Sequence, residues 1–145
     1  MYGGFGEDKV WGMNPGEMQH EGSYSYLHGG PGNDILYGAP QGKDEYGREY
    51  LFGDYRTTSY EGTYERTNDD IIYTGDSPEH SGPSYLGDKV YGGRGNDKLY
   101  GQGAAPHILY GNEGDDYMVG GSGDNVMHGD DYSAGPGWLF GAGRP

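Results

Sequence analysis

The sequence contains no cysteine, so neither a disulfide framework nor a thiolate metal site can hold the chain together. It also lacks any apolar stretch long enough to span a bilayer as a helix. The first ten residues, MYGGFGEDKV, have neither the basic nor the hydrophobic region of a secretory signal. Either a signal has been removed, or export uses another route, or the protein stays inside the cell.

Basic and hydrophobic residues are both scarce. Nine Lys and Arg face 23 Asp and Glu, for a net charge of −14, which argues against a basic patch for nucleic acid or anionic membranes and favours cations as partners. Only 32% of residues are hydrophobic and 32 are glycine, the residue that loses most backbone freedom on folding. This composition is typical of disordered chains, but the glycines recur in a regular order that indicates a fold.

A short unit, x-U-x-Gly with U aliphatic, recurs eleven times. Glycine stands two residues after U in every unit except one, where Thr74 replaces it. Three apolar residues between glycine turns are too short for a helix, so each unit predicts a brief strand with U pointing inward and its neighbours outward. The U residues are Val10, Leu27, Leu36, Leu51, Ile72, Val90, Leu99, Leu109, Met118, Met127 and Leu139.

The turns between these units carry a resemblance. Residues 3–11 read GGFGEDKVW, residues 29–37 read GGPGNDILY and residues 92–100 read GGRGNDKLY, while residues 111–119 and 120–128 are degenerate copies. These segments resemble the nonapeptide G-G-x-G-x-D-x-U-x of repeats-in-toxin (RTX, hemolysin-type calcium-binding) proteins. Three matches to so long a motif are a specific signal, and the weaker pattern covers nearly the whole chain.

The resemblance implies an all-β fold, a right-handed parallel β-roll in which two nonapeptides form one turn of the solenoid and Ca2+ ions lie between turns. Glycine turns allow carbonyl oxygens to converge, and calcium accepts six to eight oxygen ligands in flexible geometry. We therefore expect a single domain over residues 1–145, with insertions near residues 13–25, 39–49, 54–69 and 75–87.

The family places its ligand aspartate two residues before U. If strands alternate between the two faces of the roll, one edge carries five aspartates followed by Gly137, and the other carries a mixed set. This segregation predicts one calcium ladder of about four sites at the strand spacing of roughly 4.8 Å. The predicted ligands are Asp8, Asp34, Asp70, Asp97 and Asp116, with turn atoms of Gly4, Gly6, Gly30, Gly32, Gly93, Gly95 and Gly114.

The mixed edge, with Ser25, Glu49, Asp88, His107 and Asn125, holds most of the long insertions and is degenerate as a metal edge. Asp88, Asp124 and Asn125 are weaker candidate ligands there, and exposed turn carboxylates are the favoured interpretation. On the calcium edge, Asn68 and Asp69 replace the glycine pattern before Asp70, which leaves the sites beside Asp70 in doubt.

Five stacked carboxylates repel one another in a chain with a large entropic cost of folding. We therefore expect the calcium-free protein to be largely disordered and the metal to drive folding.

The residue after U points outward and is aromatic in eight of eleven units. Stacked rings on neighbouring strands stabilise a sheet without any partner, but such faces also form protein contacts, and both interpretations stand. The candidate partner-binding residues are Trp11, Tyr37, Phe52, Tyr73, Tyr91, Tyr100, Tyr110 and Phe140. His28 and His128 are expected to extend the aromatic row.

A full repeat begins at Gly3, and residues 141–143 resemble the opening of another turn, so neither end carries a polar cap. This indicates either a segment of a longer protein or copies stacked head to tail. We expect no enzymatic activity, because the five histidines and the serines form no known catalytic motif.

The predicted function is a calcium-binding structural element that is extracellular, secreted or at the cell surface, and that self-associates or packs into a filament or other assembly. The alternative is a secretion or binding module of a longer type I secreted protein. An ice-binding role would need threonine ladders, which the sequence lacks, and a glycan-binding face is conceivable because Tyr and Trp stack on sugars.

Overall fold

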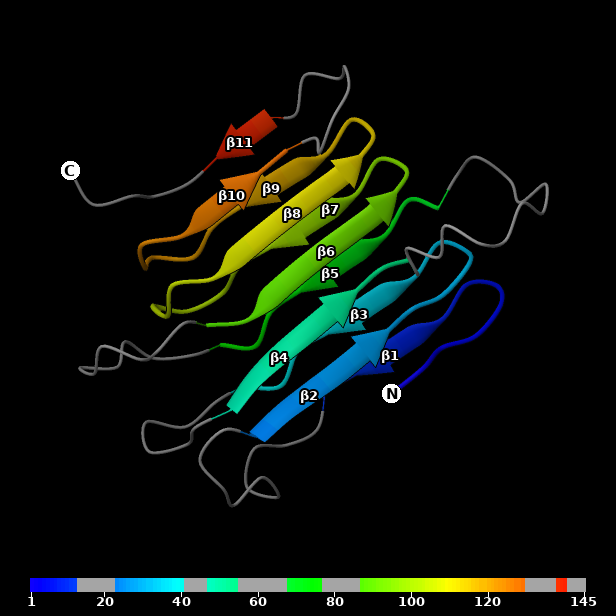
Figure 1. The fold of residues 1–145 in the computed structure, drawn as a ribbon, viewed down its shortest axis with the longest axis horizontal. Helices are drawn as coiled ribbons and strands as arrows, with labels where there is room; N and C mark the ends of the chain where they lie inside the picture. Colours follow the sequence, from blue (N-terminus) through cyan, green and yellow to red (C-terminus); the bar gives the residue numbers. More distant parts are fainter. Residues whose placement is uncertain (13–22, 41–46, 55–67, 77–86, 130–137, 141–145) are drawn as a thin grey trace.

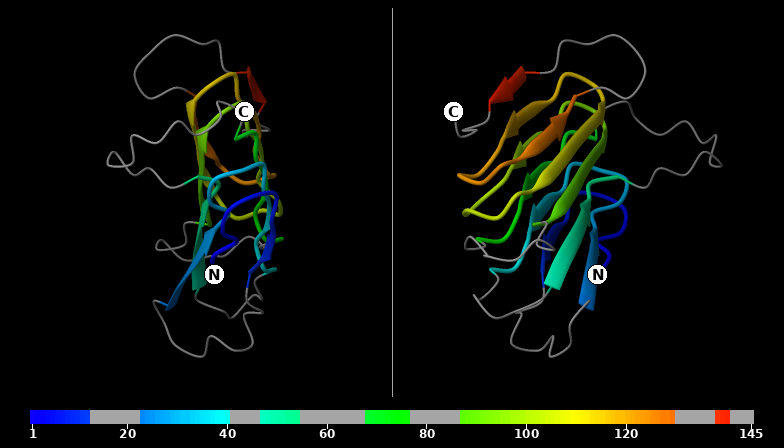
Figure 2. Two further views of the ribbon diagram at one scale, coloured as in Figure 1. Left: turned by 90° about the vertical axis from the view of Figure 1, so that its right-hand side faces the viewer. Right: turned by 60° about the vertical axis from the view of Figure 1, so that its left-hand side comes forward.

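The computed structural model describes residues 1–12, 23–40, 47–54, 68–76, 87–129 and 138–140. These residues form eleven strands in two parallel sheets, with no helix in the described part of the chain. The sheets lie face to face as two layers (Figures 1 and 2). Successive strands alternate between the layers, so the chain is a parallel β-roll, as the repeat predicts.

One sheet contains the odd-numbered strands and the other the even-numbered strands. The six-stranded sheet runs in the order β1 (Lys9–Trp11), β3 (Ile35–Tyr37), β5 (Ile71–Tyr73), β7 (Lys98–Tyr100), β9 (Tyr117–Val119) and β11 (Trp138–Phe140). The five-stranded sheet, in front in Figure 1, runs in the order β2 (Ser23–His28), β4 (Gly47–Phe52), β6 (Lys89–Arg94), β8 (Ile108–Glu113) and β10 (Val126–His128).

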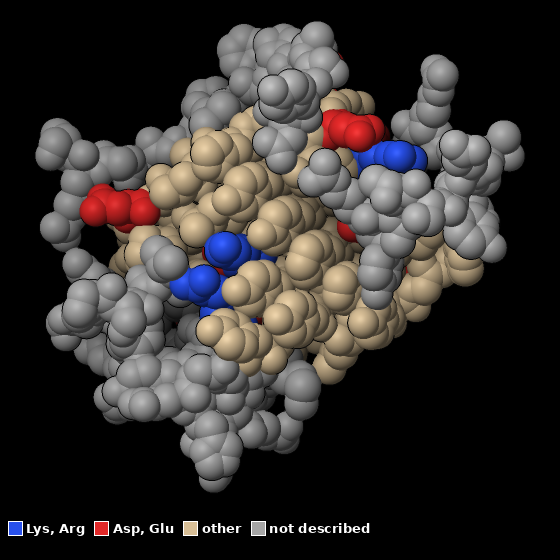
Figure 3. Space-filling view, in the orientation of Figure 1, with Lys and Arg blue, Asp and Glu red and all other residues tan. Residues whose placement is uncertain are grey.

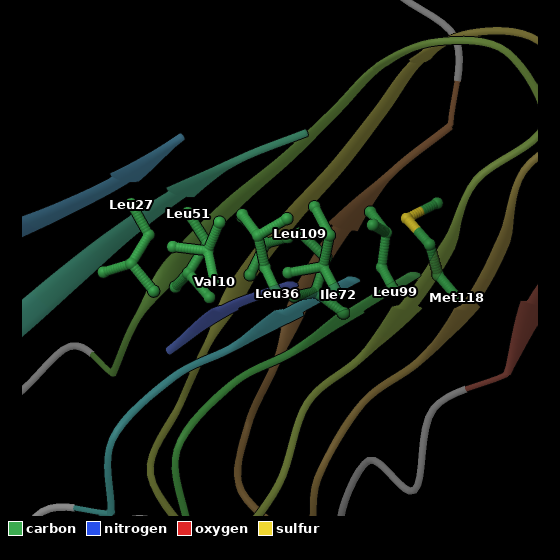
Figure 4. Packing of buried hydrophobic residues seen from close by; sticks show 9 residues of the cluster. Val10, Leu27, Leu36, Leu51, Ile72, Leu99, Leu109 and Met118 are labelled. Carbon is green, nitrogen blue, oxygen red and sulfur yellow. The ribbon is translucent and has the colours of Figure 1, made fainter. Parts of the chain in front are cut away.

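The core consists of the predicted U residues, which pair in register within each sheet. Val10 pairs with Leu36, and Leu27 pairs with Leu51. Nine of the U residues are buried and Met127 packs against them partly buried, so the two rows interdigitate as a thin core (Figure 4). Alternation by two along each strand sends the flanking side chains outward, which confirms the predicted inward and outward positions.

Four strands are longer than the three residues expected from the sequence, because each has six residues. β2 and β4 begin before their core units and pair from Ser23 and Gly47 onward. β6 and β8 continue into the turns, where Arg94 pairs with Glu113. Strand pairing extends beyond the core units because the neighbouring turns keep the register of the strands beside them.

The predicted insertions lie largely outside the described residues. Gly137 and the side chains of β11, including Phe140, also lie outside them. Within the part of the chain that the structure describes, no helix is long and apolar enough to cross a membrane.

Candidate functional site

In the described part of the chain, five turns precede the odd-numbered strands from β1 to β9 and stack along one edge of the roll, which we call the aspartate edge. We number the six residues of the motif G-G-x-G-x-D as positions 1 to 6 of each turn. The glycines at positions 2 and 4 adopt positive φ, a conformation that side chains disfavour. They are Gly4, Gly6, Gly30, Gly32, Gly93, Gly95 and, at position 4 of the fifth turn, Gly114, whereas Asn112 takes position 2 there with φ 78°.

The predicted aspartates form a continuous ladder along this edge. The backbone N–H of Asp8 donates to Asp34 Oδ1 at 2.8 Å, and that of Asp34 to Asp70 Oδ1 at 2.7 Å. The same bond joins Asp70 to Asp97 at 2.8 Å and Asp97 to Asp116 at 3.0 Å. One oxygen of each carboxylate from Asp34 to Asp116 therefore holds the previous turn in place.

The second oxygen is different. The Oδ2 atoms of Asp8, Asp34, Asp70 and Asp97 are buried and have no hydrogen-bond partner. A buried charged oxygen without a partner is costly, so this edge requires a compensating cation or proton. Burial raises the pKa of Asp34 to about 6, that of Asp70 to about 8 and that of Asp97 to about 9, although a backbone N–H partly opposes each shift.

Turn carbonyls lie close to these carboxylates because the turns stack tightly. A Cβ atom added to Gly30 would collide with the carbonyl oxygen of Gly4, and one added to Gly32 with that of Gly6. A Cβ at Gly92 would collide with Asp97 Oδ2. The glycines therefore provide the space in which carbonyl and carboxylate oxygens gather.

Calcium fits this donor set, because it is a hard cation that binds carboxylate and carbonyl oxygens. The unpartnered carboxylate oxygens and the close turn carbonyls supply such donors. No group of three acidic or histidine side chains converges among the residues that the structure describes, so the carbonyls are needed to complete any site. The individual ligands and the number of ions remain predictions.

The opposite edge is a second ladder, built from the turn residues before the even-numbered strands. The backbone N–H of Glu49 donates to Asp88 Oδ1 at 3.0 Å, that of Asp88 to His107 Nδ1 at 3.0 Å, and that of His107 to Asn125 Oδ1 at 2.9 Å. The favoured interpretation of an exposed carboxylate is wrong for Asp88, which is fully buried, because its turn packs under the neighbouring ones.

In this second ladder the other polar atom of each side chain also has a partner. Glu49 Oε2 accepts the N–H of Ala39 at 2.7 Å, Asp88 Oδ2 that of Gly75 at 3.3 Å, and Asn125 Nδ2 donates to Gly121 O at 2.9 Å. Asp88 and Asn125 are the two weaker candidate ligands in this ladder. Their side chain oxygens, which would bind a metal, already accept backbone N–H groups. Asp124, the third, is exposed.

The network around His107 explains the one repeat that lacks its glycine. His107 Nδ1 accepts a backbone N–H, so the proton lies on Nε2, which donates to Gln102 O at 2.6 Å. Thr74, at the exceptional position, accepts the N–H of Gln102 at 2.8 Å and lies 3.4 Å from His107 Nε2. The backbone N–H of Thr74 donates to Tyr100 O at 2.9 Å, as that of Gly38 donates to Tyr73 O, and the hydroxyl adds a second link to the next turn.

The predicted aromatic residues stack into one column on each sheet. On the six-stranded sheet the rings of Trp11, Tyr37, Tyr73 and Tyr100 stack in order, 4.9 to 5.8 Å between centroids. On the five-stranded sheet the column contains His28, Phe52, Tyr91, Tyr110 and His128, 4.7 to 5.0 Å apart, so the histidines extend the row as expected. Ring faces cover one another, which leaves few faces open for a sugar.

Two residues of these features, Tyr2 and Asp54, were missed from the sequence, and the role of Asn68 was not foreseen. Tyr2 stacks on His28 at 4.8 Å and extends the column, but it precedes the first repeat and carries no motif signal. Asp54 and Asn68 belong to the third turn of the aspartate edge, where Asn68 Nδ2 donates to Asp54 Oδ2 at 2.8 Å. The signal available for Asp54 was its place directly after Gly53, where the motif has its second glycine.

Comparison with protein families agrees with the geometry. The family model described as RTX calcium-binding nonapeptide repeat matches residues 25–40, 86–105 and 108–131, with four copies. The matched residues include the second, fourth and fifth turns of the aspartate edge, but not the first and third. No curated protein and no solved structure matches the chain significantly.

Proposed function

We propose that the chain, which carries four copies of the RTX calcium-binding nonapeptide repeat, is a calcium-folded structural module of that repeat family and acts outside the cell. The family's repeats are structural and bind calcium, and proteins that contain them are typically secreted. We assign the module no catalytic role. Calcium is plentiful outside cells, so a fold that depends on it forms there.

One observation carries this proposal: the column of buried, unpartnered carboxylate oxygens along the aspartate edge. The hydrophobic core is too thin to offset such a column, since it has only one inward side chain per strand. A bound divalent cation removes the desolvation cost and the mutual repulsion at once. Binding that occurs only in the folded state then stabilises that state by mass action.

We further propose that copies of the module associate through their sheet faces. In the ten strands whose side chains the structure describes, no acidic residue flanks a core residue. On the five-stranded face, uncharged residues surround a cluster of Lys and Arg near the middle, and acidic residues lie at the margins (Figure 3). In a chain with a net charge of −14, edges repel edges, whereas these aromatic faces can approach one another.

A module within a longer type I secreted protein is the second candidate, and the match to the repeat family favours it. In that case the faces contact another part of the same protein rather than a second copy. The two candidates share calcium-driven folding and differ in whether the isolated chain assembles.

Calcium removal tests calcium-driven folding, which both candidates share. Circular dichroism during a calcium titration should show loss of β structure in excess chelator and its return with calcium. Asp97→Asn should raise the calcium midpoint about tenfold, because ligand charge sets calcium affinity. Asp115→Asn removes the same charge from an exposed residue of the same edge and should change the midpoint little.

Electron microscopy and light scattering then separate the two candidates. Assemblies that form with calcium and dissolve in chelator support self-association, whereas a calcium-saturated monomer leaves the module within a longer protein. Full β structure in chelator would contradict calcium-driven folding itself.

A further inference from the structure

The third turn of the aspartate edge is split by an insertion, yet its flanking residues keep the register of an uninterrupted turn. Gly53 and Asp54 come before residues 55–67, and residues 68–70 come after them. The backbone N–H of Asp54 donates to Gly92 O at 3.1 Å, as that of Gly4 donates to Gly29 O and that of Gly30 to Gly53 O. Asp54 therefore stands at position 2.

The residues after the insertion fall at positions 4 to 6. A Cβ atom at Gly95 would collide with Asn68 O, as one at Gly32 would with Gly6 O, so Asn68 stands at position 4. The N–H of Asp69 donates to Asn33 Oδ1 at 2.9 Å, and that of Asn96 to Asp69 Oδ1 at 2.8 Å, which places Asp69 at position 5. Asp70 continues the position 6 ladder.

Position 2 differs from the other turns in what it presents to its neighbour. Gly30 of the second turn packs on the carbonyl oxygen of Gly4, whereas the nearest atom to a Cβ built on Gly93 is the Cβ of Asp54, at 2.7 Å. Among the described residues, Asn112 is the only non-glycine with positive φ, so Asp54 does not share the backbone of Gly4 and Gly30. The side chain of Asp54 therefore begins where the first turn presents the carbonyl of Gly4 to its neighbour.

The carboxylate of Asp54 reaches across the gap between the third and fourth turns. Its Oδ2 accepts the backbone N–H of Arg94 at 3.3 Å and the side chain N–H of Asn68 at 2.8 Å. A carboxylate has about four acceptor positions, so two donors do not exhaust it. Asp54 is only 8% exposed, and a carboxylate so buried is costly unless its charge is compensated.

The aspartates on both sides of this gap have oxygens that lack a partner. Asp70 and Asp97 are each 1% exposed, and the Oδ2 atom of each is buried without a hydrogen bond. Asp54 thus brings a third buried carboxylate to the two turns that bound this gap, although the three side chains do not converge closely enough to hold an ion without carbonyl oxygens. Of these three residues, only Asp97 lies in a segment that matches the repeat family.

We infer that Asp54 is an additional calcium ligand, which makes the gap between the split third turn and the fourth turn a calcium site despite its missing glycines. This inference rests on the proposed calcium-driven folding. The insertion is tolerated because Asp54 and Asn68 close the turn by their side chain hydrogen bond. Asp54 replaces a neutral carbonyl with a charged oxygen, so this site binds calcium more tightly than a glycine turn would.

Calcium binding to three variants tests the inference, with titration calorimetry and terbium luminescence as readouts. Asp54→Asn removes the charge and should weaken one site about tenfold, or remove one ion from the count. Asn68→Ala breaks the same hydrogen bond from its other end but leaves the Asn68 carbonyl, so its ion count should match that of the parent chain. Asp76→Asn, an exposed charge away from this edge, is the matched charge control.

Equal calcium binding by Asp54→Asn and the parent chain would overturn the inference and leave Asp54 a structural residue. If Asp54→Asn does not fold at any calcium concentration, Asp54→Glu decides, because it restores the charge. Recovery of calcium-driven folding in Asp54→Glu supports the ligand role, and failure to recover overturns it. A parent chain that folds without calcium would instead contradict the proposed function itself.

Discussion

At the scale of single residues, the two edges of the roll perform the same backbone task with different side chains. On both edges the atom at position 6 accepts a backbone N–H from the preceding turn. The second polar atom decides the chemistry. On the aspartate edge Oδ2 has no protein partner in Asp8, Asp34, Asp70 or Asp97, whereas His107 and Asn125 each donate theirs to a turn carbonyl.

The buried imidazole of His107 supports the metal-free edge, and we expect its removal to be costly. His107→Ala leaves the N–H of Asp88 and the carbonyl of Gln102 unsatisfied, so it should lower the free energy of unfolding by about 2–4 kcal/mol. The measurement is urea unfolding in saturating calcium.

His107→Asn is the matched control, because its Oδ1 can accept the N–H of Asp88 as Asn125 Oδ1 accepts that of His107. It should recover about half of the lost stability. An asparagine variant as unstable as the alanine variant would show that the acceptor is not what His107 contributes.

At the scale of the strands, the aromatic columns bind neighbouring rungs to one another. In the five-stranded sheet Tyr91 stacks between Phe52 at 4.9 Å and Tyr110 at 5.0 Å, with planes within 8° of parallel. Such pairs contribute roughly 0.5–1.5 kcal/mol each beyond burial. The columns therefore stabilise the sheets, whatever contact their outer edges make.

Tyr91→Ala tests this contribution. It removes two stacks and should lower the free energy of unfolding by about 2–4 kcal/mol in saturating calcium. Tyr91→Phe keeps the ring and should change stability by less than about 0.5 kcal/mol. If the alanine variant is as stable as the parent chain but no longer assembles, the column serves partner binding instead.

At the scale of the whole molecule, a chain of net charge −14 is held by a thin core and by the edges that flank it. Among the described residues, the acidic side chains lie in the turns or beside them, while the faces carry aromatic, aliphatic and a few lysine side chains. Neutralising the aspartate edge is thus the step on which the stack depends. Protons and calcium ions can each do so, but they compete for the same oxygens.

This competition gives stability an opposite pH dependence with and without calcium. Burial raises the pKa of Asp34, Asp70 and Asp97 in the folded protein to about 6, 8 and 9, against an unfolded value of about 3.9. Without calcium, these groups stabilise the fold below pH about 4 and lose that contribution as pH rises through the folded pKa values.

In calcium-free buffer the folded fraction should therefore be higher at pH 5.5 than at pH 8.5. With calcium the order should reverse, since protons displace the ion at the lower pH. Circular dichroism at both pH values, with and without calcium, measures the four states. The same pH slope in both conditions would show that these aspartates do not hold the ion.

Much of this architecture can be predicted from the sequence. The x-U-x-Gly unit identifies the strands, and alternation by two identifies the buried residues, because both depend on near neighbours in the chain. The position of each aspartate relative to U also predicts the edge on which it lies. These inferences hold for Val10 and Asp8 as well as for Met118 and Asp116.

Only the tertiary structure decided what the turn side chains do once the turns are stacked. The burial of Asp88, the link between Thr74 and His107, and the closure of the third turn by Asp54 and Asn68 all join residues 13 or more apart. Such contacts depend on the register between turns and on where an insertion leaves and re-enters the stack. Local sequence determined the strands of this roll, whereas stacking determined which polar atoms find partners and which are left for a cation.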